Sequence, residues 1–247
     1  MSMNTFMSAA LMAVLAVASS ASAQAPAPNL EKLKQFKVSG TDLNIPTVPQ
    51  TGRSADGSGR EVFARGVRNS VGMDFNPKNG ELWFTDNQVD GMGDDQPPGE
   101  LNRAVKPAAH YGFPWYGGGK VRTAEYKDSK PPADAVFPEL ELAPHAADLG
   151  MTFYTGTKFP QKYQNGMFIA EHGSWNRTTP IGARVMFVPL KANGSADRAE
   201  VFAEGWLDPE TKQYRGRPVD VAVMRDGSML VSDDFAGALY RITYVGE

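Results

Sequence analysis

The sequence has no cysteine, only three histidines and no excess of positive charge. Without cysteine the chain cannot form disulfides, thiolate metal sites or a cysteine nucleophile, and three scattered histidines argue against a structural zinc site. The 25 basic and 28 acidic residues give a formal net charge of -3, so no broad positive field is available to hold a nucleic-acid backbone. Thiol chemistry and nucleic-acid partners are therefore not expected.

The first 23 residues have the pattern of an export signal. The apolar run from Ala9 to Ala18 is followed by Ala21-Ser22-Ala23, a small-x-small cleavage pattern. The run is about ten residues long, shorter than the roughly 20 that span a bilayer, so we expect a periplasmic or secreted protein, not membrane-spanning, cleaved near Ala23. The segment before the run has no Lys or Arg, and a buried or frayed helix is the alternative reading.

The remaining chain divides into two parts. Residues 24–60 are polar and broken by prolines, which predicts an extended arm or linker. Residues 61–247 carry short β-branched and aromatic runs separated by turn dipeptides, and few segments keep a helical period. With 41% hydrophobic residues overall, this second part is expected to form one all-β domain with its own core.

A weak internal repeat indicates what kind of all-β domain this is. Three times, an apolar segment leads into a turn and then into a short apolar strand that ends in a carboxylate. The turns are Asn79-Gly80, Asn165-Gly166 and Asp226-Gly227, and a further turn of the same kind is Asn193-Gly194. Spacings of roughly 60 to 85 residues favour four-stranded propeller blades with insertions over a sandwich or a solenoid.

A long stretch from Asp86 to Pro138 interrupts the repeat. It reads as loop-rich, and loops of this length inside a compact domain are usually functional or disordered. Its aromatic residues argue against disorder. Several carboxylates and amides lie close together near its start, among them Asp90, Asp94 and Asp95. They could bind a hard cation such as Ca²⁺, or form a solvated loop with local turns, and the residues alone leave both readings open.

Three motifs lie at strand ends. Arg68-Asn69 precedes one apolar strand and Arg217 precedes another, and such groups could grip a planar polyacid or close a blade through an ion pair. The run from Glu171 to Arg177 crowds polar and aromatic side chains onto a strand exit. A serine hydrolase is not expected there, because Ser174 lies outside a Gly-x-Ser-x-Gly elbow.

These motifs together resemble the L-sorbosone dehydrogenase branch of the glucose/sorbosone dehydrogenases that depend on pyrroloquinoline quinone (PQQ). The resemblance runs from about Asp56 to Tyr244. The residues that carry it are Val67 to Phe75, Leu82 to Asn87, Gly93 to Asp95, Glu100 to Asn102, Tyr111 to Pro114, Glu171 to Arg177, Gly216 to Asp220 and Ser232 to Asp234.

The resemblance implies a six-bladed propeller that binds PQQ and Ca²⁺ and removes hydride from a sugar or aldehyde. It places Arg68, Asn69 and Arg217 at the cofactor, with His172 and Arg177 near it. It places Asn87 and Gln88 where backbone carbonyls hold the cofactor's calcium, and Glu100 and Tyr111 near a second, structural calcium. Since the sequence has no cysteine for haem attachment, we expect the electrons to leave to a separate cytochrome or quinone.

One departure from the family limits these expectations. The segment with the resemblance accounts for about three blades, and the early half of the propeller, which carries the family's histidine base, has no counterpart. None of the three histidines lies in that motif, so no catalytic residue can be named. Turnover is therefore in doubt, and two alternatives stay open: a non-enzymatic Ca²⁺-binding propeller fragment that binds sugar or quinone, and a Ca²⁺-dependent propeller lactonase. Two chains could also join into one ring, so a homodimer is possible.

Overall fold

The computed structural model of the chain describes residues 62–246, which belong to one compact unit. The export signal and the arm predicted over residues 1–60 lie outside the described residues. Within residues 62–246 the elements are almost all strands, with a single 3-10 turn, η1 (Gln161–Tyr163). In this part of the chain no helix has the length and apolar character needed to cross a membrane.

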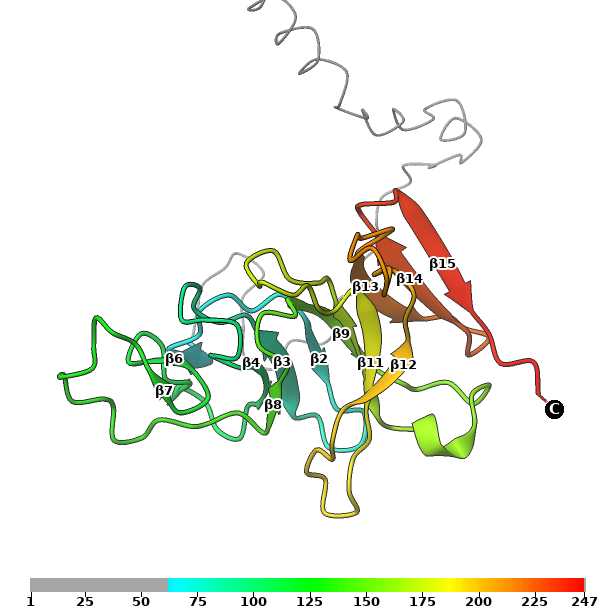
Figure 1. Cartoon of the computed structure of the whole chain (residues 1–247). Coiled ribbons are helices and arrows are strands. Elements are labelled where there is room, and N and C mark those ends of the chain that lie inside the picture. The colour runs from blue at the N-terminus through cyan, green and yellow to red at the C-terminus, as the bar shows by residue number, and fades with distance from the viewer. Residues whose placement is uncertain (1–61, 247) are drawn as a thin grey trace, which may run out of the picture. The chain divides into compact units, whose positions relative to one another are not determined.

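Three antiparallel sheets follow one another along the chain, and we name them blades A, B and C (Figure 1). Blade A contains β2 (Met73–Phe75), β3 (Leu82–Asp86), β4 (Gly99–Arg103) and β8 (Leu140–Leu142). Blade B contains β9 (Asp148–Phe153), β10 (Met167–Glu171), β11 (Arg184–Val188) and β12 (Glu200–Ala203). Blade C contains β13 (Pro218–Val223), β14 (Met229–Asp233) and β15 (Ala238–Ile242). Each strand pairs with the next one in the order given, so the predicted partial propeller of about three blades is confirmed.

Two smaller sheets lie in the segments around blade A. Strand β1 (Ala64–Arg65) pairs in parallel with β5 (Ala109–His110), and β6 (Tyr116–Gly118) pairs with β7 (Val121–Arg122). Strands β5, β6 and β7 all belong to the long segment between β4 and β8. This segment is an insertion between the third and fourth strands of blade A.

Three of the predicted turns lie at the bends between the first and second strands of the blades, and the fourth, Asn193-Gly194, lies between β11 and β12. Gly80 and Gly227 have φ values of 71° and 79°, and Asn165 has a φ of 61°. Glycine and asparagine tolerate this left-handed region, which most side chains avoid. The repeat read from the sequence therefore corresponds to the first hairpin of each blade.

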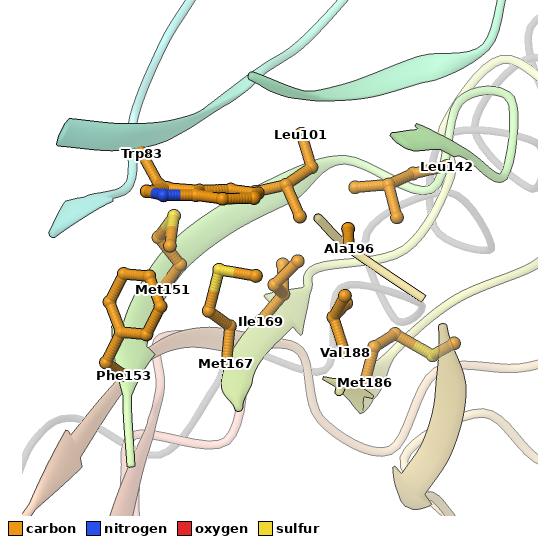
Figure 2. Packing of buried hydrophobic residues seen from close by; sticks show 10 residues of the cluster. All are labelled: Trp83, Leu101, Leu142, Met151, Phe153, Met167, Ile169, Met186, Val188 and Ala196. Atoms are coloured by element: carbon orange, nitrogen blue, oxygen red, sulfur yellow. The ribbon is translucent and has the colours of Figure 1, made fainter. Parts of the chain in front are cut away.

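Blade B lies between the other two blades and shares a core with each. On one side Trp83, Leu101 and Leu142 of blade A face Met151, Met167 and other side chains of blade B (Figure 2). The Trp83 ring packs edge-on against Phe153, with ring centroids 6.2 Å apart. On the other side Phe168, Val185 and their neighbours on blade B pack against Val221, Met229 and Val231 of blade C. Burial of these side chains supplies most of the stabilisation that holds the blades together.

Strand β4 was not expected, because the stretch from Asp86 onward reads as loop-rich. Its sequence, Gly-Glu-Leu-Asn-Arg, has only one large apolar residue, and the other side chains are polar. Nevertheless Glu100 and Asn102 are buried, at 2% and 0% exposure. The strand pairs with β3 on one side and β8 on the other, so its backbone groups are hydrogen-bonded along both edges although most of its side chains are polar. Buried polar strands lack the hydrophobic pattern on which sequence-based assignment depends.

Candidate functional site

The motifs Arg68-Asn69 and Arg217 are held by equivalent aspartates at the ends of two second strands. The Asp86 carboxylate, at the end of β3, accepts hydrogen bonds from the backbone N–H groups of Arg68 and Asn69, at 3.1 and 2.7 Å. The Asp233 carboxylate, at the end of β14, accepts one from the backbone N–H of Arg217 at 2.9 Å. The equivalence of the two arginines that the sequence predicts is therefore confirmed at the level of the backbone.

Four predicted site residues line one cavity between blades A and B. Arg68, Asn69, Asn87 and Gln88 surround a cavity of about 190 Å³. The connection between β8 and β9, the start of β9 and the loop after β10 contribute His145, Asp148, Trp175 and Asn176. Trp175 is 75% exposed, so its indole offers a free aromatic face at this cavity. The cavity thus combines a cation, amides and an aromatic ring with the carboxylates of Asp90 and Asp148.

The Arg68 guanidinium lines this cavity and is bound by the segment that follows β3. It donates to the carbonyl oxygen of Asn87 at 3.0 Å and forms an ion pair with Asp90 at 3.3 Å. The Arg68 side chain is about one quarter exposed and the Asp90 side chain 43% exposed. An ion pair this exposed is weak, so an anionic ligand can compete for the guanidinium.

The loop after β10 is clamped onto the acidic loop of blade A. Asn176 donates to the Asp90 carboxylate at 2.8 Å, and Arg177 donates to the backbone oxygen of Asp94. The backbone N–H of Thr178 donates to the Asp94 carboxylate at 3.0 Å. Protein donors therefore occupy these loop carboxylates. Across residues 62–246, no group of three or more His, Cys, Asp or Glu side chains is placed to hold a metal ion.

His172 and Arg217 lie at the junction of blades B and C and do not line the cavity that contains Arg68. The Arg217 guanidinium donates to the carbonyl oxygens of His172 and Gly173, at 2.9 and 2.5 Å, and stacks over the Tyr214 ring. The His172 ring contacts the Asp234 carboxylate at 2.9 Å. In this arrangement the Arg217 guanidinium binds the strand exit after Glu171 through backbone carbonyls, and among the described residues it has no carboxylate partner for a blade-closing ion pair.

Glu100 lies in a buried oxygen-rich cluster of blade A. Its carboxylate accepts hydrogen bonds from Asn102 at 3.0 Å and from the backbone N–H of Gly119 at 2.8 Å. The Asn102 Oδ1 and the Gln88 Oε1 are buried and have no hydrogen-bond donor. Burial raises the pKa of Glu100 to about 7, and the nearby Asp86 carboxylate adds to this rise. Carboxylate and amide oxygens without donors are the ligands that Ca²⁺ takes, so this cluster fits a calcium ion.

The predicted partner of Glu100, Tyr111, is engaged elsewhere through its side chain. The Tyr111 hydroxyl donates to the Arg103 backbone oxygen at 3.1 Å, and the ring packs edge-on against Phe84. The Tyr111 side chain therefore belongs to the apolar cluster on the outer face of blade A.

Two buried carboxylates that the sequence did not single out as a pair face each other beside the cavity. Asp148 and Glu171 are cross-strand neighbours on β9 and β10, at 1% and 0% exposure. Arg184 donates to Glu171 at 2.5 Å, whereas Asp148 Oδ1 and Glu171 Oε1 have no donor. Burial raises the pKa of both carboxyls. The Glu171 charge raises the pKa of Asp148 further, and the Arg184 guanidinium lowers the pKa of both. A Cβ at Gly99 would lie 2.1 Å from Asp148 Oδ2, so only glycine leaves room for this carboxylate.

The raised pKa of Glu100 predicts a dependence of stability on pH. A folded-state pKa of about 7, against an ordinary value of 4.5, means that the folded chain binds this proton more tightly than the unfolded chain does. In chelator-treated protein, the free energy of unfolding should therefore fall as pH rises from about 4.5 to about 7. For Glu100 alone we expect a fall of about 2 to 3 kcal/mol.

Urea unfolding of the wild type and of Glu100→Gln across this pH range measures the effect. Glu100→Gln should have a flatter profile than the wild type, because the amide does not titrate. The exposed Glu210→Gln is the control and should keep the wild-type profile. Equal slopes for the wild type and Glu100→Gln would show that Glu100 does not carry this linkage.

A sequence model of the TrAA12-like family matches residues 118–245 of this chain, more than half of its length. The chain belongs to this family. Among solved structures, the iodide structure of Trichoderma reesei carbohydrate-active enzymes family AA12 superposes with a TM-score of 0.61 at 22% identity. The match covers 73% of this chain and 53% of that chain. The quinoprotein-type propeller fold is thereby confirmed.

Two curated relatives are similar in sequence. An uncharacterized protein of Borreliella burgdorferi is 40% identical over 186 residues, covering 74% of this chain and 49% of the relative. A PQQ-dependent pyranose dehydrogenase of Coprinopsis cinerea is 32% identical over 137 residues, covering 49% of this chain and 18% of the relative. This chain thus spans half or less of the length of these relatives. The expected resemblance to PQQ-dependent sugar dehydrogenases is confirmed at this coarser level, and the sorbosone branch stays a prediction.

Proposed function

We propose that this chain is the cofactor-binding part of a PQQ-dependent sugar or aldehyde oxidoreductase, of the sorbosone dehydrogenase type. The observation that carries the proposal is the convergence of Arg68, Asn69, Asn87 and Gln88 on one cavity between blades A and B. These are four of the residues that the family resemblance assigns to the cofactor and its calcium. Similarity to a PQQ-dependent pyranose dehydrogenase supports the same reading.

The proposed cofactor is a planar tricarboxylate, and the cavity offers matching groups. The Arg68 guanidinium and the Asn69 amide bind its carboxylates, and the exposed Trp175 indole packs against its rings. The Asn87 carbonyl accepts only one hydrogen bond, from Arg68, and its second lone pair remains for Ca²⁺. The Glu100 carboxylate, Asn102 Oδ1 and Gln88 Oε1 hold the structural calcium.

Bound PQQ supplies a two-electron acceptor for hydride from the sugar or aldehyde carbon. The chain's own residues orient the substrate and form the wall of the cavity. His145 Nε2 contacts the carbonyl oxygens of Gly93 and Gln96, at 2.8 and 3.0 Å, so this nitrogen carries the proton. Nδ1 then accepts from the Asn176 amide at 3.3 Å. These bonds position His145 in the wall between the two loops. The electrons pass to a separate acceptor such as a cytochrome or quinone.

Arg68→Leu tests the proposal in purified protein with Ca²⁺ and PQQ added. Loss of the charge-assisted hydrogen bonds should weaken PQQ binding about 10- to 100-fold, as measured by calorimetry and by the change in cofactor absorbance. The exposed Arg198→Leu is the matched control and should bind as the wild type does. Equal affinity in both variants, or no binding by the wild type, would count against this cavity as the PQQ site.

Activity separates the proposal from its two alternatives. Dye reduction with sorbosone or aldoses in the presence of PQQ is expected from the oxidoreductase. Cofactor binding without dye reduction would favour the non-enzymatic calcium-binding fragment, since turnover needs a base and binding does not. Lactone hydrolysis with Ca²⁺ and without PQQ would favour the lactonase.

We propose that the protein acts outside the cytoplasm. We assign residues 1–23 to a signal peptide, residues 24–60 to an arm and residues 61–247 to the propeller domain. The apolar run and the Ala21-Ser22-Ala23 pattern support export. Amino-terminal sequencing of the expressed protein tests this assignment: cleavage near Ala23 is expected, and an intact amino terminus in cytoplasmic protein contradicts it.

A further inference from the structure

We propose that Asn176 and Asp148 are specificity-determining residues of the cavity between blades A and B. A side-chain oxygen of each accepts a hydrogen bond from a hydroxyl group of the substrate. The cavity therefore binds a polyhydroxylated sugar and rejects a simple aldehyde. The inference rests on the proposed function for the reaction, and it decides between the two substrate classes that the cofactor site leaves open.

The cavity brings together buried acceptor oxygens that have no donor. Three residues that line it contribute such an atom: Gln88 Oε1, Asp148 Oδ1 and Asn176 Oδ1. The first is assigned above to the structural calcium, which leaves the other two for a ligand. A buried acceptor without a donor costs free energy, so a ligand that brings donors to these oxygens gains affinity.

The orientation of the Asn176 amide is fixed by two neighbours. Its Nδ2 donates to the Asp90 carboxylate at 2.8 Å, and an ionised carboxylate can only accept. Nδ2 also donates to His145 Nδ1 at 3.3 Å, and this nitrogen is an acceptor because Nε2 donates to two carbonyl oxygens. Turning the amide over would set Oδ1 against both acceptors. Oδ1 is therefore held in place as an acceptor for a ligand.

Asp148 is held in the same cavity by contacts with blade A. Its backbone oxygen accepts a hydrogen bond from Asn87 Nδ2 at 3.0 Å. Its carboxylate lies against Gly99, which lines the same cavity and has no side chain that would displace it. The whole residue is only 1% exposed. A side chain held this firmly loses little freedom when it binds a ligand.

The groups proposed for the cofactor come from another part of the chain. Arg68 and Asn69 precede blade A, whereas Asp148 and Asn176 belong to β9 and to the loop after β10 of blade B. An anionic cofactor gains nothing from two acceptor oxygens, one of them on a carboxylate. A neutral polyol brings a hydroxyl donor to each. The two ligands therefore use groups of different blades.

Unpartnered acceptors of this kind give strong selectivity. An analogue without the hydroxyl group displaces water from the acceptor and returns no hydrogen bond. Each missing hydroxyl should therefore weaken binding about 10- to 100-fold. A simple aldehyde lacks both hydroxyls and loses both contributions.

Sugar binding to chelator-treated, PQQ-free protein tests the inference. Calorimetry first ranks a panel of aldopentoses and aldohexoses, and the monodeoxy analogues of the tightest ligand are then measured. In the wild type, two of these analogues should bind about 10- to 100-fold more weakly than the parent sugar. Butyraldehyde, which carries no hydroxyl group, should not bind.

Two variants assign the two hydroxyl groups. Asp148→Ala should abolish one of the two penalties for a missing hydroxyl, and Asn176→Leu should abolish the other, because the acceptor concerned is gone. Asp220→Ala is the matched control, since Asp220 is exposed on β13 and does not line this cavity. It should keep both penalties. The series of analogues with the wild type needs no substitution, so the test does not depend on the folding of a variant.

Several results would overturn the inference. These are equal affinity for the parent sugar and all its deoxy analogues, penalties that persist in both variants, and no sugar binding at all. Tight Ca²⁺ binding that Asp148→Ala and Asn176→Leu both weaken would also do so, because the oxygens would then be cation ligands. The PQQ titration of Arg68→Leu is separate: sugar selectivity without PQQ binding would keep this inference and contradict the proposed cofactor site.

Discussion

Replacing Arg184 by methionine is expected to lower the free energy of unfolding by about 3 to 5 kcal/mol, because it leaves a buried carboxylate without its cation. Glu171 is completely buried, and Arg184 is the donor to its Oε2. Asp148 lies beside it, equally enclosed. With the guanidinium removed, two buried carboxyl groups would share no counter-charge, and at least one of them must take up a proton.

The pH dependence of this loss identifies its cause. Burial already raises the pKa of both carboxyls, and removing Arg184 raises them further. The folded variant then binds protons more tightly than the unfolded chain, so its deficit relative to the wild type should grow as pH rises and shrink in acid. Urea unfolding at several pH values measures this. Arg198→Met, at an exposed site, is the control and should cost little.

A deficit below about 1 kcal/mol for Arg184→Met would contradict the buried-charge account. The double variant Glu171→Gln/Arg184→Met offers a second check. Since the amide carries no charge, the double variant should recover part of the stability lost by Arg184→Met alone.

Trp83→Ala should destabilise the chain by about 3 to 5 kcal/mol through loss of the core between blades A and B. Trp83 is completely buried, packs edge-on against Phe153 and lies under the Arg103 guanidinium. Its indole N–H has no acceptor, so the polar atom contributes nothing that alanine would forfeit. Trp83→Phe should therefore cost much less than Trp83→Ala, because it keeps most of the packing.

Trp175→Ala is the matched control, since the same substitution is made at a residue that is 75% exposed. It should leave thermal unfolding nearly unchanged while weakening PQQ binding. Trp83→Ala should do the reverse when binding is measured below its unfolding temperature. If both variants lost equal stability, the position of the core between the two blades would have to be revised.

The repeat could be predicted from the sequence because its signals are local. The turns at Gly80, Asn165 and Gly227 require residues that tolerate positive φ, and apolar strands follow them directly. The third strand of blade A could not be predicted in this way. Its buried Glu100 and Asn102 are stabilised by each other and by Gly119, and such contacts leave no hydrophobic pattern in the sequence.

The candidate site was predictable only in part for a related reason. Arg68, Asn69, Asn87 and Gln88 come from one blade and belong to motifs that can be read from the sequence. His145 and Asp148 reach the same cavity from the next blade, and only the packing of blade A on blade B brings them there. Arg217 shows the converse. Its backbone position is equivalent to that of Arg68. Its side chain, however, binds the carbonyl oxygens of His172 and Gly173 and does not line the cavity.

The insertion between β4 and β8 has a consequence for the order of folding. Blade A cannot be completed until β8 has been synthesised, and only residues 143–147 separate β8 from β9, the first strand of blade B. The closing of one blade and the start of the next are therefore joined by a short connection. Blades A and B should consequently form and unfold as one cooperative unit, and a chain cut between them should leave blade A without its core, whereas blades B and C keep the core that they share.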